Sequence, residues 1–119
     1  MVEMTMQIPD ELAAQLRPLN GYIPTVLELS LAGFRTLATE TATEIVEFLA
    51  TSPSPQEIFH YHVSERAQDR LQRLLALNSA GLLGESEQLE LDELEKIEHI
   101  LISLKARLAA QNNHQTVAS

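Results

Sequence analysis

The sequence predicts a mainly α protein that begins with a short strand and ends in an antiparallel helical hairpin. Three observations predict this fold class. Leu occurs 20 times in 119 residues and aromatic residues make up only 4%, so the core must be aliphatic and suited to helices. Apolar residues recur at spacings of three and four along most of the chain. Prolines and glycines interrupt that pattern at a few places, where we expect helices to end.

The first element is a strand. Apolar and polar residues alternate over Met4–Ile8, which is typical of a short strand with one buried face. Pro9 ends the strand, and the two acids that follow it favour a helix start because they meet the positive end of the helix dipole. We expect this first helix to run from Asp10 to about Arg17.

The second helix begins at Pro24, which suits the first helical position. Its apolar face consists of Leu27, Leu31, Phe34 and Leu37/Ala38. The β-branched and polar stretch Thr39–Thr43 interrupts the pattern. Ile45–Ala50 therefore forms either a separate short helix or a continuation after a kink.

The clearest division of the chain is Ser52–Pro55. Two prolines in three residues cannot lie inside a helix, and they favour extended backbone. We therefore expect one module over residues 1–51, a linker over 52–55 and a helical hairpin module over 56–111. Residues 112–119 form a tail that frays.

The hairpin module consists of two helices after a short one that starts at Pro55. Ser64 caps the first, which runs to about Asn78, and Gly81 and Gly84 bound the turn that follows. The last helix is long and carries apolar residues spaced 3, 4, 3 and 4, a pattern typical of a seam between helices that would join copies of the chain. The seam residues are Leu94, Ile97, Leu101, Leu104 and Leu108.

Composition indicates a cytoplasmic protein without membrane contact. The chain has no Cys, which excludes disulfides and thiolate metal sites and fits a reducing compartment. The N-terminus lacks the basic and apolar regions of a signal peptide. No stretch approaches the roughly 20 apolar residues that a membrane span needs.

Net charge is −9, from 8 basic and 17 acidic residues, which repels nucleic acid and suits a basic partner. The charge is concentrated in Glu85–Glu98, which holds seven acids and one Lys, Lys96. The pattern favours a plain solvated face, and a partner-binding acidic face is the alternative. The face residues are Glu87, Glu90, Glu95 and Glu98.

Residues that could carry chemistry are sparse, so we expect no enzyme and no cofactor. Glu57, His60 and His62 form the one local cluster, and Glu-x-x-His on a helix places both side chains on one face, as carboxylate metal sites need. A second such motif is missing, and a polar patch on a short helix is the favoured interpretation. A catalytic role for His99 would need a nucleophile or a second carboxylate beside it, and the sequence indicates neither.

The N-terminal pattern resembles the ribbon-helix-helix family, which includes repressors and the antitoxins of bacterial toxin–antitoxin pairs. The resemblance rests on Met4–Leu12, Asn20–Pro24 and the Leu27-x-x-x-Leu31 spacing. It implies a homodimer in which two strands pair as a ribbon. It also implies a C-terminal segment that covers a toxin, and the acidic helix after the Pro linker is similar to such a segment.

In that family the polar strand residues read DNA, and here these positions are Thr5 and Gln7, joined by Asn20 in the turn. Residues 1–50 contain only Arg17 and Arg35 against seven acids, which leaves little attraction for phosphates. The sequence therefore favours a strand that serves dimerisation alone over a DNA-binding one.

Three functions from different classes follow. The first is a non-enzymatic, antitoxin-like inhibitor or regulator of a basic protein, such as a nuclease toxin. The alternative is a small homo-oligomeric helical scaffold that binds neither toxin nor DNA. A metal-dependent enzyme using Glu57, His60 and His62 is the third and least favoured hypothesis.

Overall fold

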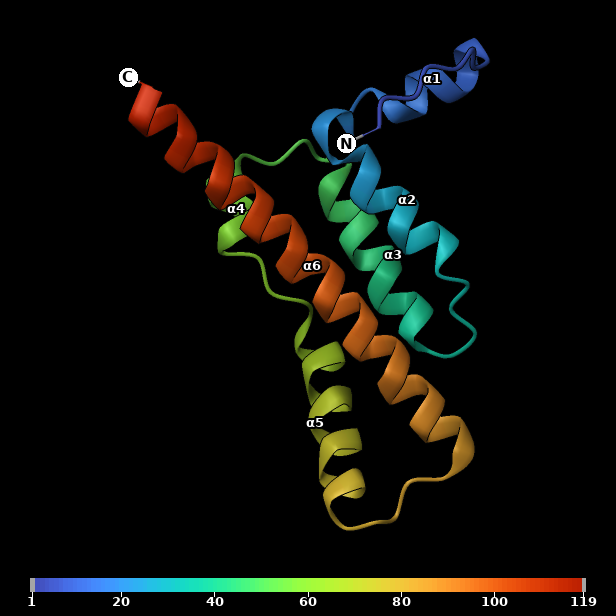
Figure 1. Cartoon of the computed structure of the whole chain (residues 1–119). Coiled ribbons are helices and arrows are strands. Elements are labelled where there is room, and N and C mark those ends of the chain that lie inside the picture. Colours follow the sequence, from blue (N-terminus) through green and yellow to red (C-terminus); the bar gives the residue numbers. More distant parts are fainter. Residues whose placement is uncertain (1, 119) are drawn as a thin grey trace.

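The protein is a bundle of helices arranged around one long C-terminal helix (Figure 1). A computed structural model describes the backbone of residues 2–118 and the side chains of residues 2–111. Within these residues all regular structure is helical. The elements are α1 (Asp10–Leu16), the short 3-10 helix η1 (Asn20–Tyr22), α2 (Ile23–Leu31), α3 (Ala38–Leu49), α4 (Pro55–Phe59), α5 (Glu65–Ser79) and α6 (Glu85–Ala118).

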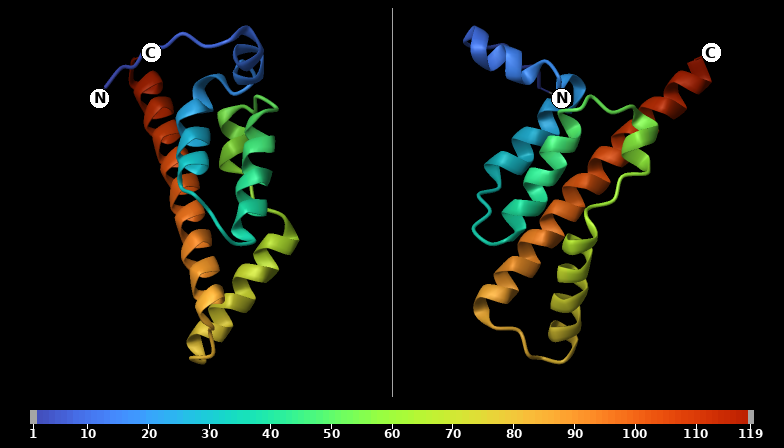
Figure 2. Two further views of the ribbon diagram at one scale, coloured as in Figure 1. Left: turned by 90° about the vertical axis from the view of Figure 1, so that its right-hand side faces the viewer. Right: turned by 180° about the vertical axis from the view of Figure 1, so that it is seen from behind.

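Helix α6 is the element against which the others pack. Its 34 residues correspond to a length of about 51 Å, which matches the 50 Å long dimension of the molecule. Helices α2 and α3 lie along one side of it, while α5 lies beside its N-terminal half and α4 beside its C-terminal half (Figures 1 and 2). The mainly α part of the prediction is therefore confirmed.

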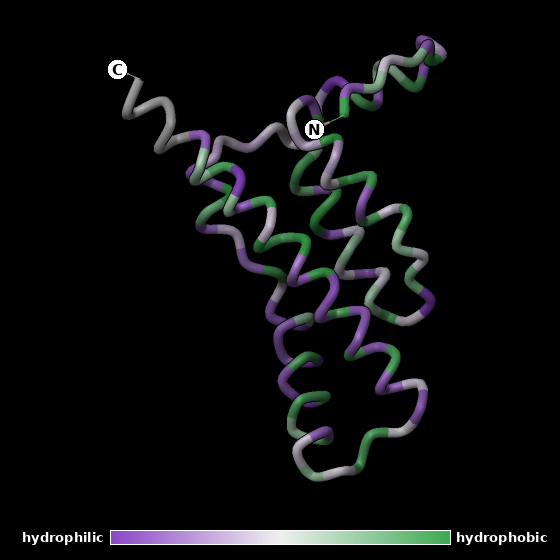
Figure 3. Tube along the Cα trace, viewed as in Figure 1, coloured by the Kyte–Doolittle hydropathy of each residue, from purple (hydrophilic) through white to green (hydrophobic). Residues whose placement is uncertain are grey.

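The predicted seam of α6 packs within its own chain. Leu94, Ile97, Leu104 and Leu108 keep at most 9% of their surface exposed, and Leu101 is half-buried. The buried stripe is wider than the predicted seam because two further α6 side chains join the same core, and Figure 3 shows how apolar and polar residues alternate along the helix. These additions are Leu91 and Ile100. In this structure the buried seam residues are therefore not free to join copies of the chain.

The predicted N-terminal strand was wrong. Residues 2–9 adopt no regular structure, and the part of the chain that the structure describes contains no strand. Alternation of apolar and polar residues stabilises a strand only where a neighbouring strand takes up its backbone hydrogen bonds. No backbone hydrogen bond joins residues 2–8 to any other described residue. We call residues 2–8 the arm, and the predicted dimeric ribbon has no strand to form it.

The break between the second and third helices also lies elsewhere than predicted. Helix α2 ends at Leu31, and Gly33 follows with a positive φ of 69°, a conformation that glycine adopts without strain. The stretch Thr39–Thr43 lies inside α3 instead of interrupting a helix. Its hydroxyls bond locally, since Thr43 Oγ1 donates to the Thr39 carbonyl at 2.9 Å. The predicted apolar face is divided as a result. Leu27, Leu31 and Leu37 are exposed at 50%, 82% and 58%, whereas Phe34 and Ala38 reach the core.

The Pro-rich linker is present but does not separate two cores. One continuous hydrophobic core includes side chains from both sides of it, such as Ile45 and Leu49 before it and Ile58 and Leu74 after it. The Tyr22 hydroxyl donates to the Pro53 carbonyl at 2.6 Å and holds the linker against the start of α2. Of the tail expected to fray, 112–119, the backbone is helical through Ala118, and Ser119 lies outside the described residues.

Helix α4 follows the linker as expected. Ser54 and Glu57 form a reciprocal capping box at its start, with Pro55 at the first helical position. Ser64 caps α5 by accepting a hydrogen bond from the Ala67 amide at 3.2 Å. A search for a membrane span found no helix of sufficient length and apolarity in the described part of the chain.

Candidate functional site

The four acids expected to bind a partner divide into two structural residues and two exposed ones. Glu87 is half-buried, and its carboxylate accepts a hydrogen bond from the Gly84 amide at 3.1 Å, which caps α6. Glu90 is buried, with only 5% of its surface exposed. Glu95 and Glu98 are exposed. The acidic face is therefore narrower than the sequence indicated.

Four exposed acids remain on the side of α6 that points away from the core, and we call them the outer acidic surface. They are Glu85, Asp92, Glu95 and Glu98. Neither of the two ion pairs among the described residues involves them. Asp92 accepts one hydrogen bond from Gln88 at 2.9 Å, one turn earlier. Their charge is therefore open to solvent and to a partner.

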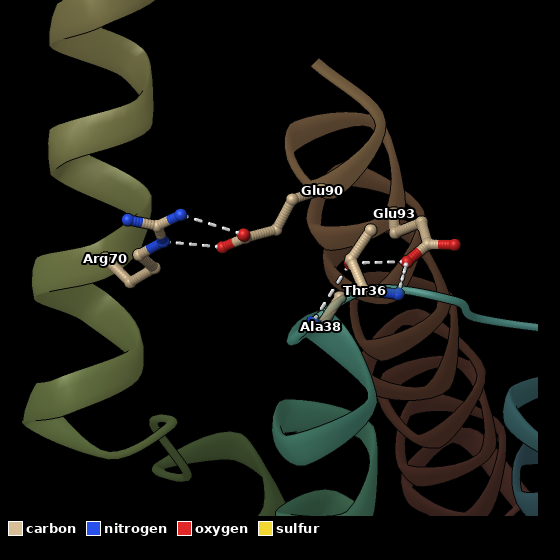
Figure 4. Close-up of polar contacts among 5 residues, drawn as sticks. All are labelled: Thr36, Ala38, Arg70, Glu90 and Glu93. Atoms are coloured by element: carbon tan, nitrogen blue, oxygen red, sulfur yellow. Dashed lines mark hydrogen bonds and ion pairs between the residues drawn. The ribbon is translucent and has the colours of Figure 1, made fainter. Parts of the chain in front are cut away.

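Glu93 is a structural carboxylate that sequence reasoning did not single out. It accepts a hydrogen bond from the Arg35 amide at 2.9 Å. It also accepts from the Thr36 amide at 3.0 Å and the Thr36 hydroxyl at 2.6 Å, the two contacts that Figure 4 draws. The same hydroxyl oxygen accepts from the Ala38 amide at 3.2 Å, at the start of α3. One side chain of α6 thus holds the loop between α2 and α3.

The ionisation of Glu93 follows from these contacts. Burial alone would raise the pKa of its carboxyl, but the hydrogen bonds from Thr36 and Arg35 favour the charged form and lower the pKa below its ordinary value. The signal in the sequence was only its place, four residues before the buried Ile97 and one before Leu94. A position beside the core stripe indicates contact with a neighbouring element.

The buried Glu90 pairs with Arg70 of α5 in a two-pronged ion pair (Figure 4). Arg70 Nε and Nη2 donate to the two carboxylate oxygens at 2.7 and 2.9 Å. The hydrogen bond with Glu90 raises the pKa of the Arg70 guanidinium, against a smaller opposite effect of burial. The pair joins α5 to α6 across the hairpin. The Arg70 neighbours Arg66 and Arg73 line a cleft of about 630 Å³ between α3, α5 and α6.

A second depression, which we call the α5–α6 groove, combines apolar walls with a polar rim. It has a volume of about 430 Å³. The walls include Val63, Ala67 and Leu71 on one side and Leu101 and Ile102 on the other. The polar side chains at its rim are His62, Gln68, Glu98 and Lys105. Glu98 belongs both to this rim and to the outer acidic surface.

One wall of the groove is fixed by an aromatic stack. The rings of Tyr61 and Phe48 lie 4.2 Å apart with an angle of 15° between their planes. Lys105 Nζ donates to the Tyr61 carbonyl at 3.1 Å and holds the backbone between α4 and α5 against α6. Burial raises the pKa of the Tyr61 hydroxyl, and nearby Glu44 adds to the effect. These contacts fix the position of the Tyr61 wall of the groove.

The positions considered for reading DNA do not form a common surface. Thr5 and Gln7 lie in the arm, and both are exposed. Asn20 starts η1 with a positive φ of 36° and lines a different depression together with Arg17 and Arg107. With the strand absent, the described residues contain no ribbon that would carry the first two into a groove of DNA.

The residues considered for metal binding make local contacts instead. The Glu57 carboxylate accepts from the Ser54 amide at 3.3 Å in the capping box. A ring nitrogen of His60 lies 2.8 Å from the Gln56 carbonyl, and His62 is exposed at the groove rim. Among the described residues no group of three or more His, Cys, Asp or Glu side chains is arranged to hold a metal ion.

Comparison with known proteins adds no relative to this picture. Neither the scan against protein-family models nor the searches of curated proteins and of solved structures found a match. The functional interpretation therefore depends on the outer acidic surface and the α5–α6 groove themselves.

Proposed function

We propose that this protein is a non-enzymatic, antitoxin-like inhibitor or regulator that binds a basic partner protein through the outer acidic surface of α6. The observation that carries the proposal is the arrangement of α6. Its apolar side is covered by the protein's own helices, while its outer side presents Glu85, Asp92, Glu95 and Glu98. A surface of one charge sign attracts a partner of the opposite sign and fixes its orientation.

The amount of charge supports the same conclusion. Seven of the 17 acids lie in Glu85–Glu98, opposed by Lys96 alone. Glu90 is paired with Arg70, and Glu87 caps α6 by accepting from the Gly84 amide. Glu93 accepts hydrogen bonds from the loop between α2 and α3. The remaining four are exposed and gathered on one helix. A solvated helix needs no such excess, because mixed charges give solubility with less self-repulsion.

Co-expression with the product of the adjacent gene tests this function. We expect that product to be basic, to inhibit growth when expressed alone, and to co-purify with this chain. Reversing two charges with Glu95→Lys and Glu98→Lys should weaken binding at least about tenfold and abolish growth rescue. Glu40→Lys with Glu47→Lys, which makes the same charge change on exposed positions of α3, is the matched control. A gene product that neither inhibits growth nor binds this chain would refute the proposal.

The second candidate function is a homo-oligomeric helical scaffold. It is supported by large apolar side chains left exposed on α2, where Leu27 and Leu31 keep 50% and 82% of their surface. Light scattering should then show that Leu31→Asp dissociates the assembly. Expression of the adjacent gene's product should have no effect on growth. An oligomer that survives Leu31→Asp excludes a scaffold built on α2.

A further inference from the structure

The arm leaves three apolar side chains at alternate positions without cover. Val2, Met4 and Met6 keep 88%, 81% and 68% of their surface exposed. In an extended segment alternate residues share one side, so these three form a continuous apolar edge. Figure 2 shows the arm as an extended segment apart from the helices. Single exposed apolar residues are ordinary, whereas a continuous edge marks a contact surface.

The α5–α6 groove has the dimensions to take this edge. It follows α6 from Leu94 to Lys105, a rise of about 17 Å. An extended chain from Val2 to Met6 spans about 14 Å. Methionine side chains are unbranched and flexible, and they fill irregular apolar spaces well. The arm therefore matches the groove in length and in the adaptability of its apolar side chains.

The polar positions of the arm match the rim of the groove. Glu3 lies on the edge of the arm opposite the apolar residues, so its side chain starts outward from the groove and is long enough to bend toward the rim. Lys105 uses one of its three N–H donors on the Tyr61 carbonyl, which leaves two for a carboxylate. Gln68 and Glu98 offer a donor and acceptors to Thr5 and Gln7, which follow Glu3 on the same edge.

The arm that fills the groove belongs to a second copy of the chain. Figures 1 and 2 place α1, which the arm precedes, at the end of the molecule away from α5. We propose that each of two copies places its arm in the α5–α6 groove of the other, without strand pairing. Such a reciprocal contact closes a two-fold dimer. This dimer needs no basic partner, although Glu98 borders both the groove and the outer acidic surface.

Charging the arm tests the dimer. Met4→Asp with Met6→Asp places carboxylates against the apolar floor and should raise the dimer dissociation constant about 100-fold or more in sedimentation velocity. Ile102→Asp should do the same from the groove side, since this residue is 55% exposed and its change leaves the core intact. Ala14→Asp with Gln15→Asp adds the same charge at exposed positions of α1, outside both the arm and the groove. It is the matched control and should keep the dimer. Far-ultraviolet circular dichroism checks that every variant is folded.

A monomeric wild-type chain, or a dimer that survives both Met4→Asp/Met6→Asp and Ile102→Asp, overturns the inference. The location is tested separately because the chain has no Cys and accepts a single spin label. A nitroxide on Thr5→Cys, on the outward edge of the arm, mixed with unlabelled ¹⁵N-enriched chain, should broaden the amide signals of Val63 and Ile102 in the other copy. Broadening confined to the partner's arm or α2, or none between copies, refutes the arm-in-groove contact.

Discussion

Replacing Glu93 by Ala removes the carboxylate that holds the α2–α3 loop against α6. Three donors lose their acceptor, namely the amides of Arg35 and Thr36 and the Thr36 hydroxyl. The site is half-buried and water replaces part of the loss, so we take about 1 kcal/mol for each hydrogen bond. The free energy of unfolding should fall by about 2–3 kcal/mol. Glu95→Ala, an exposed acid on the same helix, should change it by less than about 0.5 kcal/mol.

Urea titration followed by circular dichroism measures both free energies, provided that the variants share the m-value of the wild type. Amide hydrogen exchange adds a local measurement. The amides of Arg35 and Thr36 should exchange faster in Glu93→Ala than in the wild type, and at the wild-type rate in Glu95→Ala. Equal stability of the two variants, or unchanged exchange at both loop amides, would refute the role assigned to Glu93.

The same contact predicts a pH dependence. The pKa of Glu93 is lower in the folded chain than its ordinary value, so the charged carboxylate stabilises the fold above the unfolded-state pKa of about 4.3. This contribution is lost as the pH falls through the lower folded-state pKa. The difference in unfolding free energy between wild type and Glu93→Gln should therefore be complete at pH 7 and shrink below about pH 4. A difference that is constant down to acid unfolding would contradict this assignment.

Three further substitutions, each measured by urea titration, test the packing around α6. Arg70→Met should destabilise the fold by about 2–3 kcal/mol because it leaves the Glu90 charge buried and unpaired, whereas Arg70→Met with Glu90→Leu should recover most of that loss. Gly33→Ala should cost about 1 kcal/mol, since its φ is 69°, while Gly21→Ala, without a positive φ, should cost much less. Leu104→Ala should cost about 2–5 kcal/mol, because its side chain is 3% exposed in the core. A loss below about 1 kcal/mol would show that the seam is not packed within the chain.

Most helices could be predicted because their signals are local. Pro55 and Ser54 mark the start of α4, Ser64 caps α5, and the Gly81 region, with a φ of 72° at that glycine, ends the hairpin's first helix. These cues depend on residues within one turn of each other. They hold whatever the rest of the chain does, which is why the structure keeps them.

The failures came from patterns whose meaning depends on distant residues. The alternation at Met4–Ile8 is the pattern of a half-buried strand, but no other described segment pairs with it. The threonines at Thr39–Thr43 looked like a break, yet α3 packs its Thr41 and Ala42 side chains into buried sites. Tertiary packing outweighed their weak helix propensity.

The sequence located the candidate site only in part, because contacts between distant residues decide which acids are exposed. The sequence identified an acidic helix correctly, but spacing alone could not say which carboxylates point outward. Glu90 lies one residue before the buried Leu91 and faces Arg70, and Glu93 reaches the loop between α2 and α3. Both contacts join residues 20 or more positions apart. The α5–α6 groove is likewise a product of packing, since its walls come from separate elements.

Labelling of carboxylates with a carbodiimide, read by mass spectrometry, tests the central claim most directly. That claim is that α6 keeps Glu90 and Glu93 for its own fold and presents Glu95 and Glu98 to a basic partner. In the free chain the four acids of the outer acidic surface, Glu95 and Glu98 among them, should react faster than Glu90, and the partner should protect those four. Equal reactivity of Glu90 and Glu95 in the free chain, or a bound partner that leaves Glu95 and Glu98 fully reactive, would contradict the account.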